Sequence, residues 1–439
     1  MLVHPASSTA ATPGRNRALF AVGLVVSLGM GASLAYHGVQ AFYLQRSYPY
    51  STFLFRPLDH FMDFFNDYRY AGQFGPKHDM MAYSAPVMAV LRAAHVLPAT
   101  AVFVALVAAF VAVLCGMVYR YGTRGLDARL ERIQYTVLLG LFTYPVLFII
   151  DRGNLDLLVF LALAGFFYLH LVKGSHWSWI LLAFAISAKY YPATLLVLFL
   201  CDRRYREAVY AVVGAAGFTL LSAISLSVAS GRSVAGVLAA VARQLGRHDA
   251  YSRTVDSVQH GHSLWGALTW IVGTHGQSTF TQDMAMNGVQ GLSRPYLLAA
   301  LLVFVLIAIY VVWFEKTTWR RVTLLVLGMV LLPYESHDYT LVLLYFPLMM
   351  LLYETRGQRS EVVYAVLLAV PLIPVDYYVF GQTDVAVSVF IYPFALVAVG
   401  VAIVVDGMAL HVRTAHAPEL LHATDLRSAE PEAAPRQNT

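Results

Sequence analysis

Apolar runs long enough to cross a lipid bilayer recur along almost the whole chain. Residues 101–117, 155–172 and 297–314 are examples, and each approaches or reaches the roughly 17–25 apolar residues of a membrane-spanning helix. Short polar segments, many of them basic, separate one run from the next. The pattern therefore predicts an all-α polytopic membrane protein with about 11–12 transmembrane helices.

The composition excludes most other classes of protein. Hydrophobic residues make up 59% of the 439 residues and charged residues only 13%, whereas soluble domains carry roughly 25% charged residues. A soluble enzyme, a fibrous protein and a disordered protein are therefore excluded. The two cysteines, Cys115 and Cys201, lie inside or at the end of apolar runs, so they predict no disulfide framework, zinc site or redox pair.

The basic residues are placed as membrane anchors. They cluster in short segments between apolar runs, at Arg120, Arg124, Arg129 and Arg132, at Arg203, Arg204 and Arg206, and at Lys316, Arg320 and Arg321. Such segments stay in the cytoplasm under the positive-inside rule. The net charge of +5 therefore indicates anchoring in a cell membrane, and nucleic acid is not expected as a partner.

The same rule predicts a topology. Arg15 and Arg17 keep the N-terminus in the cytoplasm, and the first apolar run is expected to be an uncleaved transmembrane helix. The predicted organisation is a cytoplasmic segment at 1–18, a transmembrane domain at 19–405 with outer loops at 37–97 and 230–294, and a disordered cytoplasmic tail at 406–439.

One apolar stretch, 177–201, has two interpretations. A single span would place the arginines that follow it outside, whereas two short helices would place them inside. The stretch is interrupted by Lys189-Tyr190-Tyr191-Pro192, and proline disfavours a helix at and before its own position. We therefore predict a pair of helices broken at this turn.

The first outer loop carries a stripe of acids. Asp59, Asp63 and Asp67 are spaced i, i+4, i+8, and Arg69 follows them. On a helix this spacing puts the three acids on one face. They are either the solvated side of an amphipathic helix whose phenylalanines enter the lipid, or a site in which one acid is a general base and the others position substrate.

Further polar residues are predicted on the outer side, where ionisable groups close to the hydrocarbon indicate function. We expect them to gather in one extracytoplasmic cavity, and the candidates are Arg152, Asn154, Lys189, Tyr190, His260, His262, His337 and Asp338. Arg152, Lys189 and His337 are candidates for binding a phosphate. The alternatives are a helix-end pair for Arg152, a side chain that reaches the membrane interface for Lys189, and a helix cap for His337-Asp338.

His260 and His262 also raise the question of a metal. They are spaced i, i+2, and no nearby acid completes a ligand shell. We expect a loop that contacts substrate, and no metal site is predicted.

Several short motifs, in order over residues 20–400, resemble the GT-C glycosyltransferases, and in particular family 87. They are an Asp-Phe pair after the first transmembrane helix, Tyr83-Ser84-Ala85-Pro86, Arg152-Gly153-Asn154-Leu155-Asp156, Lys189-Tyr190-Tyr191-Pro192 and Ser336-His337-Asp338-Tyr339. Family 87 contains polyprenol-phosphate-mannose-dependent mannosyltransferases and related arabinofuranosyltransferases. The resemblance implies a GT-C helix bundle with its site on extracytoplasmic loops and with Asp63 as the catalytic base.

The resemblance also implies the reaction. A glycosyl residue, by preference mannose, would pass with inversion from a polyprenyl-phosphate-linked donor to a glycolipid or polysaccharide acceptor at the outer face of a bacterial plasma membrane. No cofactor is implied, and a requirement for a divalent cation is not expected. The alternatives are a transporter or flippase of lipid-linked saccharides, disfavoured because Lys189 is nearly the only charge in the middle of an apolar run, and an O-antigen ligase or polymerase.

Overall fold

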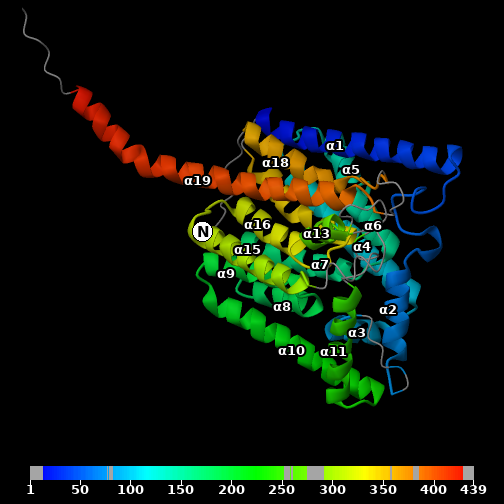
Figure 1. The fold of residues 1–439 in the computed structure, drawn as a ribbon. Coiled ribbons are helices and arrows are strands. Elements are labelled where there is room, and N and C mark those ends of the chain that lie inside the picture. Colours follow the sequence, from blue (N-terminus) through cyan, green and yellow to red (C-terminus); the bar gives the residue numbers. More distant parts are fainter. Residues whose placement is uncertain are drawn as a thin grey trace, which may run out of the picture.

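Helices are the regular secondary structure throughout the residues that the computed structural model describes, which are 13–76, 78, 83–251, 258, 261–273, 291–355, 358–378 and 385–428. No strand is formed within these ranges, where only isolated bridges pair single residues. Figure 1 shows the helices gathered in one bundle, with α1 (Pro13–Gly38) along one side and α10 (Tyr205–Ser230) along the opposite side. The all-α class is confirmed.

Five helices in the described residues are long and apolar enough to cross a membrane on their own. They are Asn16–Tyr43, formed by α1 and its π-helical end η1 (Val39–Tyr43); Ala99–Gly122, formed by α4 (Ala99–Met117) and η3 (Val118–Gly122); α10; α15 (Ser293–Trp313); and Ser388–Ala409 within α19 (Ser388–Ser428). The protein is thus a polytopic membrane protein. A count of about 11–12 crossings stays a prediction, because the other predicted spans are short or broken helices.

Two predicted spans illustrate these breaks. The stretch 177–201 forms α8 (Ser178–Ala188), the 3-10 turn η5 (Tyr191–Leu195) and α9 (Leu196–Cys201), with Lys189 extended between them at φ −143°. The predicted break is therefore confirmed. An unpredicted break divides the apolar segment 129–152 into α5 (Arg129–Leu141) and α6 (Tyr144–Arg152), bent by 48°, because Pro145 lies in the first turn of a new helix there.

The centre of the bundle is built from short helices that are buried on most sides. They are α7 (Asp156–Phe167) with η4 (Tyr168–Val172), α16 (Thr318–Leu331), the 3-10 turn η6 (Asp338–Leu344) and α17 (Tyr345–Glu354). Around them, α18 (Arg359–Ala369) and η7 (Val370–Leu372) pack against α1, and α8 packs against α10. Several of these helix ends carry polar side chains, which brings residues distant in sequence together.

The two long segments that are predicted as outer loops contain helices of their own. The first holds η2 (Pro57–Asp59), α2 (Met62–Gln73) and α3 (Ala85–Ala94), and the second holds α11 (Val234–Tyr251) and α13 (Leu264–Gly273). Figure 1 places α2, α3 and α11 at the same end of the bundle. The acidic first loop thus meets the second loop at one end of the molecule.

The C-terminal segment differs from its prediction. We predict a disordered tail from residue 406, yet α19 continues as helix to Ser428. The residues that follow the membrane-spanning part include many alanines, leucines and arginines, which favour helix, and an existing helix extends at little cost.

Candidate active site

The Asp63 carboxylate on α2 is held by two residues from the end of α6 and the turn that follows. Arg152 forms an ion pair with Oδ1 of Asp63, and Asn154 donates a hydrogen bond of 2.9 Å from Nδ2 to Oδ2. The side chains of Asp63 and Arg152 are 19% and 17% exposed, so both reach the surface of the site. Arg152 and Asn154, both predicted site residues, therefore contact the predicted base, Asp63, from a segment that is distant in the sequence.

Local backbone geometry makes this meeting possible. Gly153 ends α6 with φ +64°, a left-handed conformation that glycine adopts without strain. A Cβ on Gly153 would lie 3.0 Å from Cβ of Phe64 and 3.1 Å from the Phe61 carbonyl oxygen. The glycine of the Arg-Gly-Asn motif therefore lets α2 approach the end of α6 closely.

Asp151, next to Arg152, fixes the segment before α2. Its carboxylate accepts from His60 Nδ1 at 2.5 Å and from the Phe55 amide at 3.2 Å, and its carbonyl accepts from the Phe61 amide at 2.6 Å. Phe61 has φ +58°, so the chain turns sharply before α2 begins at Met62. The sequence motifs do not single out His60. The signal for it is Asp151, because a carboxylate at the end of an apolar run needs a hydrogen-bond donor or a cation as its partner.

A second carboxylate, Asp156, lies 1% exposed at the start of α7. Its oxygens accept hydrogen bonds from Tyr83 at 2.6 Å and from Tyr191 at 2.9 Å, and Lys189 Nζ lies 3.5 Å away. The Lys189 ammonium also faces the Tyr83 ring at 4.6 Å. Asp156 thus positions the predicted phosphate-binding lysine, and it joins three of the sequence motifs in one network.

Asp67 lies one helical turn beyond Asp63 and is buried, at 8% exposure. Burial, followed by repulsion from the Asp63 carboxylate, raises the pKa of Asp67 to about 8, while the charges of Lys189 and Arg152 lower it. Asp67 is therefore largely protonated at neutral pH. The two acids, although on one face of α2, differ in burial.

Three other predicted residues lie apart from this network. Asp59 belongs to η2, because α2 begins only at Met62, so the prediction of three acids on one helix is wrong for Asp59. Arg69 is exposed and donates to Asn66 at 3.0 Å. Tyr190 is 63% exposed beside the buried Tyr191.

A buried polar cluster surrounds Asp338 at the start of η6. Tyr144 donates to Asp338 Oδ2 at 2.7 Å, and His262 Nδ1 lies 3.4 Å from Oδ1. His262 is fully buried and its Nε2 lies 3.0 Å from Ser336 Oγ and 3.1 Å from Thr340 Oγ1. Burial lowers the pKa of His262 well below its usual value, so the ring is neutral.

The substrate contact that we predict for His262 stays a prediction. The His262 ring is enclosed, and it connects the segment before α13 to η6 and the residues that precede η6. His337 is 9% exposed and its Nε2 lies 2.8 Å from Glu335 Oε1. His260 lies outside the described residues.

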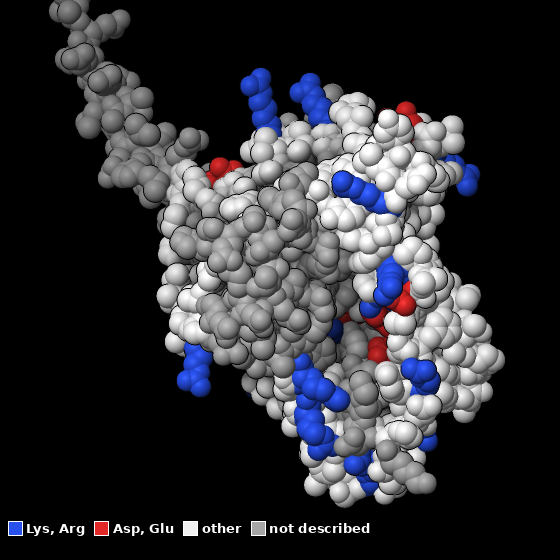
Figure 2. All heavy atoms as spheres, turned by 45° about the vertical axis from the view of Figure 1, so that its right-hand side comes forward, with Lys and Arg blue, Asp and Glu red and all other residues white. Residues whose placement is uncertain are grey.

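The face of the molecule towards α2 and α3 is hollowed. Figure 2 turns the end of the molecule that carries α2 and α3 forward, and it shows acidic side chains in a hollow with lysine and arginine side chains around it. Carboxylates and cations are thus presented together at an open site, an arrangement suited to a hydroxyl group and an anionic phosphate.

Comparison with known proteins agrees with an enzyme of the membrane. The model of glycosyltransferase family 87 matches residues 83–334, more than half of the chain. The chain therefore belongs to glycosyltransferase family 87 and is a transferase, and membership of the GT-C superfamily is consistent with this. The match includes Tyr83, Arg152, Asn154 and Lys189, whereas Asp63 and Asp338 lie outside it. No curated protein and no solved structure matches the chain.

Proposed function

We propose that the protein transfers a mannosyl residue from a polyprenyl-phosphate-linked donor to a glycolipid or polysaccharide acceptor, with Asp63 as general base. The observation that carries this proposal is the Asp63 carboxylate, which is held by Arg152 and Asn154 yet still partly exposed. Family membership supports glycosyl transfer in preference to transport of a lipid-linked saccharide.

The reaction is a single displacement. Asp63 accepts the proton of the acceptor hydroxyl while its oxygen attacks the anomeric carbon, and the bond from that carbon to the phosphate oxygen breaks. The polyprenyl phosphate leaves with the bonding electron pair. One displacement inverts the anomeric carbon, so a β-linked donor yields an α-linked product.

Cations beside the base suit the departing phosphate. Arg152 Nη2 is paired with Asp63, whereas Nη1 of the same guanidinium is buried and has no hydrogen-bond partner among the described residues. That donor is available to a phosphate oxygen, and Lys189 adds a second positive charge. Because these cations balance the charge of the leaving group, we propose that transfer needs no divalent cation and continues in EDTA.

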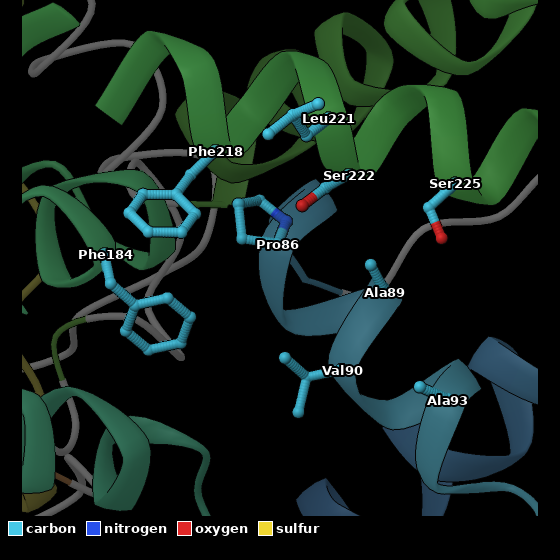
Figure 3. Close-up of a pocket in the computed structure, with 9 residues that line it drawn as sticks. All are labelled: Pro86, Ala89, Val90, Ala93, Phe184, Phe218, Leu221, Ser222 and Ser225. Carbon is cyan, nitrogen blue, oxygen red and sulfur yellow. The ribbon is translucent and has the colours of Figure 1, made fainter. Parts of the chain in front are cut away.

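An apolar groove next to the site supports a lipid-linked donor. Figure 3 shows Ala89 and Ala93 of α3 facing Phe184 of α8 and Phe218 and Ser222 of α10. The groove has a volume of about 320 Å³. The groove begins at Pro86, close to Tyr83 in the chain, and its residue Phe184 lies one to two turns before Lys189 along α8. A lipid chain attached to a phosphate at Lys189 would therefore lie near this groove.

The placement of α10 supports an extracytoplasmic site in a bacterial plasma membrane. This helix is long enough to cross the bilayer, and it starts directly after the basic segment at Arg203 and Arg204. Its other end contacts α3, where Arg92 Nη2 donates to the Ala229 carbonyl at 3.3 Å. The basic segment and the site are thus expected on opposite faces of the membrane.

The proposal is tested with membranes that contain the wild-type protein or the Asp63→Asn variant. The membranes are incubated with radiolabelled polyprenyl-phosphate mannose, and lipid and polysaccharide fractions are counted. We expect label in one of these products with the wild type and little or none with the variant. If only a polyprenyl-phosphate arabinofuranose serves as donor, the transferred sugar is arabinofuranose and not mannose. Equal labelling by the wild type and the variant would contradict the role of Asp63.

A further inference from the structure

Two pairs of aromatic rings include residues of the segment 48–55, whose last ring lies against Arg152. The Phe55 ring centroid lies 3.6 Å from Cζ of Arg152, and the Tyr48 ring lies 6.1 Å from that of Phe55. Tyr50 follows Tyr48 by two residues in the chain, and the centroid of its ring lies 5.2 Å from that of Tyr378. We call Phe55, Tyr48, Tyr50 and Tyr378 the aromatic path, and all four side chains are half-buried.

The backbone that carries the aromatic path is held in place at several points. The Phe55 amide donates to Asp151 Oδ2 at 3.2 Å, and the Tyr50 carbonyl accepts from His37 Nδ1 at 2.8 Å. The Tyr378 amide donates to the hydroxyl of Tyr36 at 3.2 Å. The rings are therefore presented in a fixed arrangement, which lowers the entropy that a ligand would lose on binding.

Half-exposed rings of this kind suit saccharides. A sugar ring has an apolar face of C–H groups that stacks on an aromatic ring, and its hydroxyls hydrogen-bond to phenol and guanidinium groups at the edge. Arg46 supplies a guanidinium 5.1 Å from the Tyr50 ring. The aromatic path thus combines apolar faces with polar edges, and it begins at the residue that touches Arg152.

We propose that the acceptor is a chain of several sugar units, and that the units behind the reacting hydroxyl bind along the aromatic path. This inference rests on the proposed function, because it assigns the acceptor side of the same site. It narrows the acceptor from any hydroxyl-bearing glycolipid to a saccharide chain long enough to extend from Asp63 to Tyr378.

The competing explanation is an aromatic belt that anchors the protein at the membrane interface. An anchoring belt has no preference for the length of a saccharide. A binding path does, because each added unit covers another ring. The dependence on acceptor length therefore separates the two explanations.

The experiment measures KM for manno-oligosaccharides of one, two, four and six units with a polyprenyl-phosphate mannose donor. For the wild type we expect KM to fall as the acceptor lengthens. Tyr50→Ala and Tyr378→Ala should each raise KM for the longest acceptor roughly three- to tenfold, as loss of one stacking contact implies. KM for mannose itself and the donor KM should not change, and Tyr50→Phe, which keeps the ring and loses only the hydroxyl, should raise KM for the longest acceptor less than Tyr50→Ala does.

Direct binding keeps this test independent of the proposed reaction. The affinity of the full-length protein for the six-unit saccharide is measured by titration calorimetry, with Tyr168→Ala as control, since Tyr168 is 43% exposed and faces Lys173 at 5.6 Å outside the aromatic path. Binding that depends on length and on Tyr50, without mannosyl transfer, would overturn the donor assignment and retain the aromatic path. Affinity that does not depend on length, or that is unchanged in Tyr50→Ala and Tyr378→Ala, would overturn the aromatic path.

Discussion

Asp63 and Arg152 form an ion pair between the first turn of α2 and the last residue of α6, although 89 residues separate them in the chain. The pair places a positive charge against one oxygen of the carboxylate, and Asn154 fixes the second oxygen. A charged carboxylate at an open site orients a hydroxyl and accepts its proton. The following predictions test this arrangement and the fold that supports it.

Lys189→Ala is expected to impair use of the donor more than use of the acceptor. Removing a charged hydrogen-bond partner costs about 1.5–3 kcal/mol, which corresponds to roughly a ten- to hundredfold loss in rate. Kinetics at varied donor and acceptor concentrations measure this effect. Lys173→Ala is the control, because Lys173 contacts Tyr168 and not the Asp156 network. An unchanged donor KM and rate would leave Lys189 with an anchoring role.

Asp67 predicts a characteristic dependence of stability on pH. Its pKa is raised to about 8 in the folded protein from 3.8, so between these values the folded state binds more protons than the unfolded state. The contribution of Asp67 to the free energy of unfolding therefore falls as pH rises from about 4 to about 8 and is constant above that range.

Asp67→Asn removes this contribution and keeps a similar shape. In thermal unfolding scans we expect the variant to melt at a higher temperature than the wild type at pH 8, with the difference disappearing towards pH 4. Asp59→Asn should show no such difference, because Asp59 is half-exposed in η2. A parallel pH dependence of Asp67→Asn and the wild type would contradict the buried, protonated carboxyl group.

His262 is predicted to support the fold and not to bind substrate. His262→Ala removes one hydrogen-bond partner from each of the buried hydroxyls of Ser336 and Thr340, which still bond to each other, and a lost hydrogen bond costs about 0.5–1.5 kcal/mol. The melting temperature should fall clearly, while donor and acceptor KM of the folded fraction stay within about twofold. His176→Ala is the control, since the His176 side chain is 84% exposed. A large change in KM at unchanged stability would assign His262 to the site.

The side of the membrane is tested by labelling single cysteines in a Cys115→Ala, Cys201→Ala background. Leu58, 87% exposed beside the site, and His176, at the end with the basic segments, are replaced by cysteine in turn. An impermeant thiol reagent added to intact cells should label the cysteine at 58 and not the one at 176. The reverse pattern would place the site in the cytoplasm.

Much of the fold is predictable because bilayer crossing imposes a long apolar run that the sequence displays directly. The first apolar run, predicted as a transmembrane helix, corresponds to α1, and the break at Lys189 follows from Pro192. The bend before Tyr144 is not predicted, because Pro145 lies inside an apolar run that looks continuous. Pro145 disfavours helix as strongly as Pro192 does, but it has no charged neighbour comparable to Lys189, so the break is not evident in the sequence.

The site is predictable only in part, since side-chain partners depend on packing between distant segments. Asp63, Arg152, Asn154 and Lys189 stand out by residue type and motif, and the structure brings them together. The hydrogen bonds from Tyr83 and Tyr191 to Asp156 cannot be predicted from the sequence, because tyrosine is common throughout the chain and these two do not stand out. Likewise, the left-handed Phe61 removes Asp59 from the helix, and no spacing rule anticipates that turn.

The central claim is that Asp63 takes the proton of the acceptor, and the most direct measurement is the rate of Asp63→Asn with a polyprenyl-phosphate mannose donor. Asparagine keeps the shape and one acceptor oxygen but does not take the proton. General-base catalysis contributes roughly 10²–10⁴-fold, so we predict a loss of that order in a variant that is folded and inserted in the membrane. Asp59→Asn should lose far less. Near-full activity of Asp63→Asn, with or without loss in Asp59→Asn or Asp67→Asn, would contradict the account.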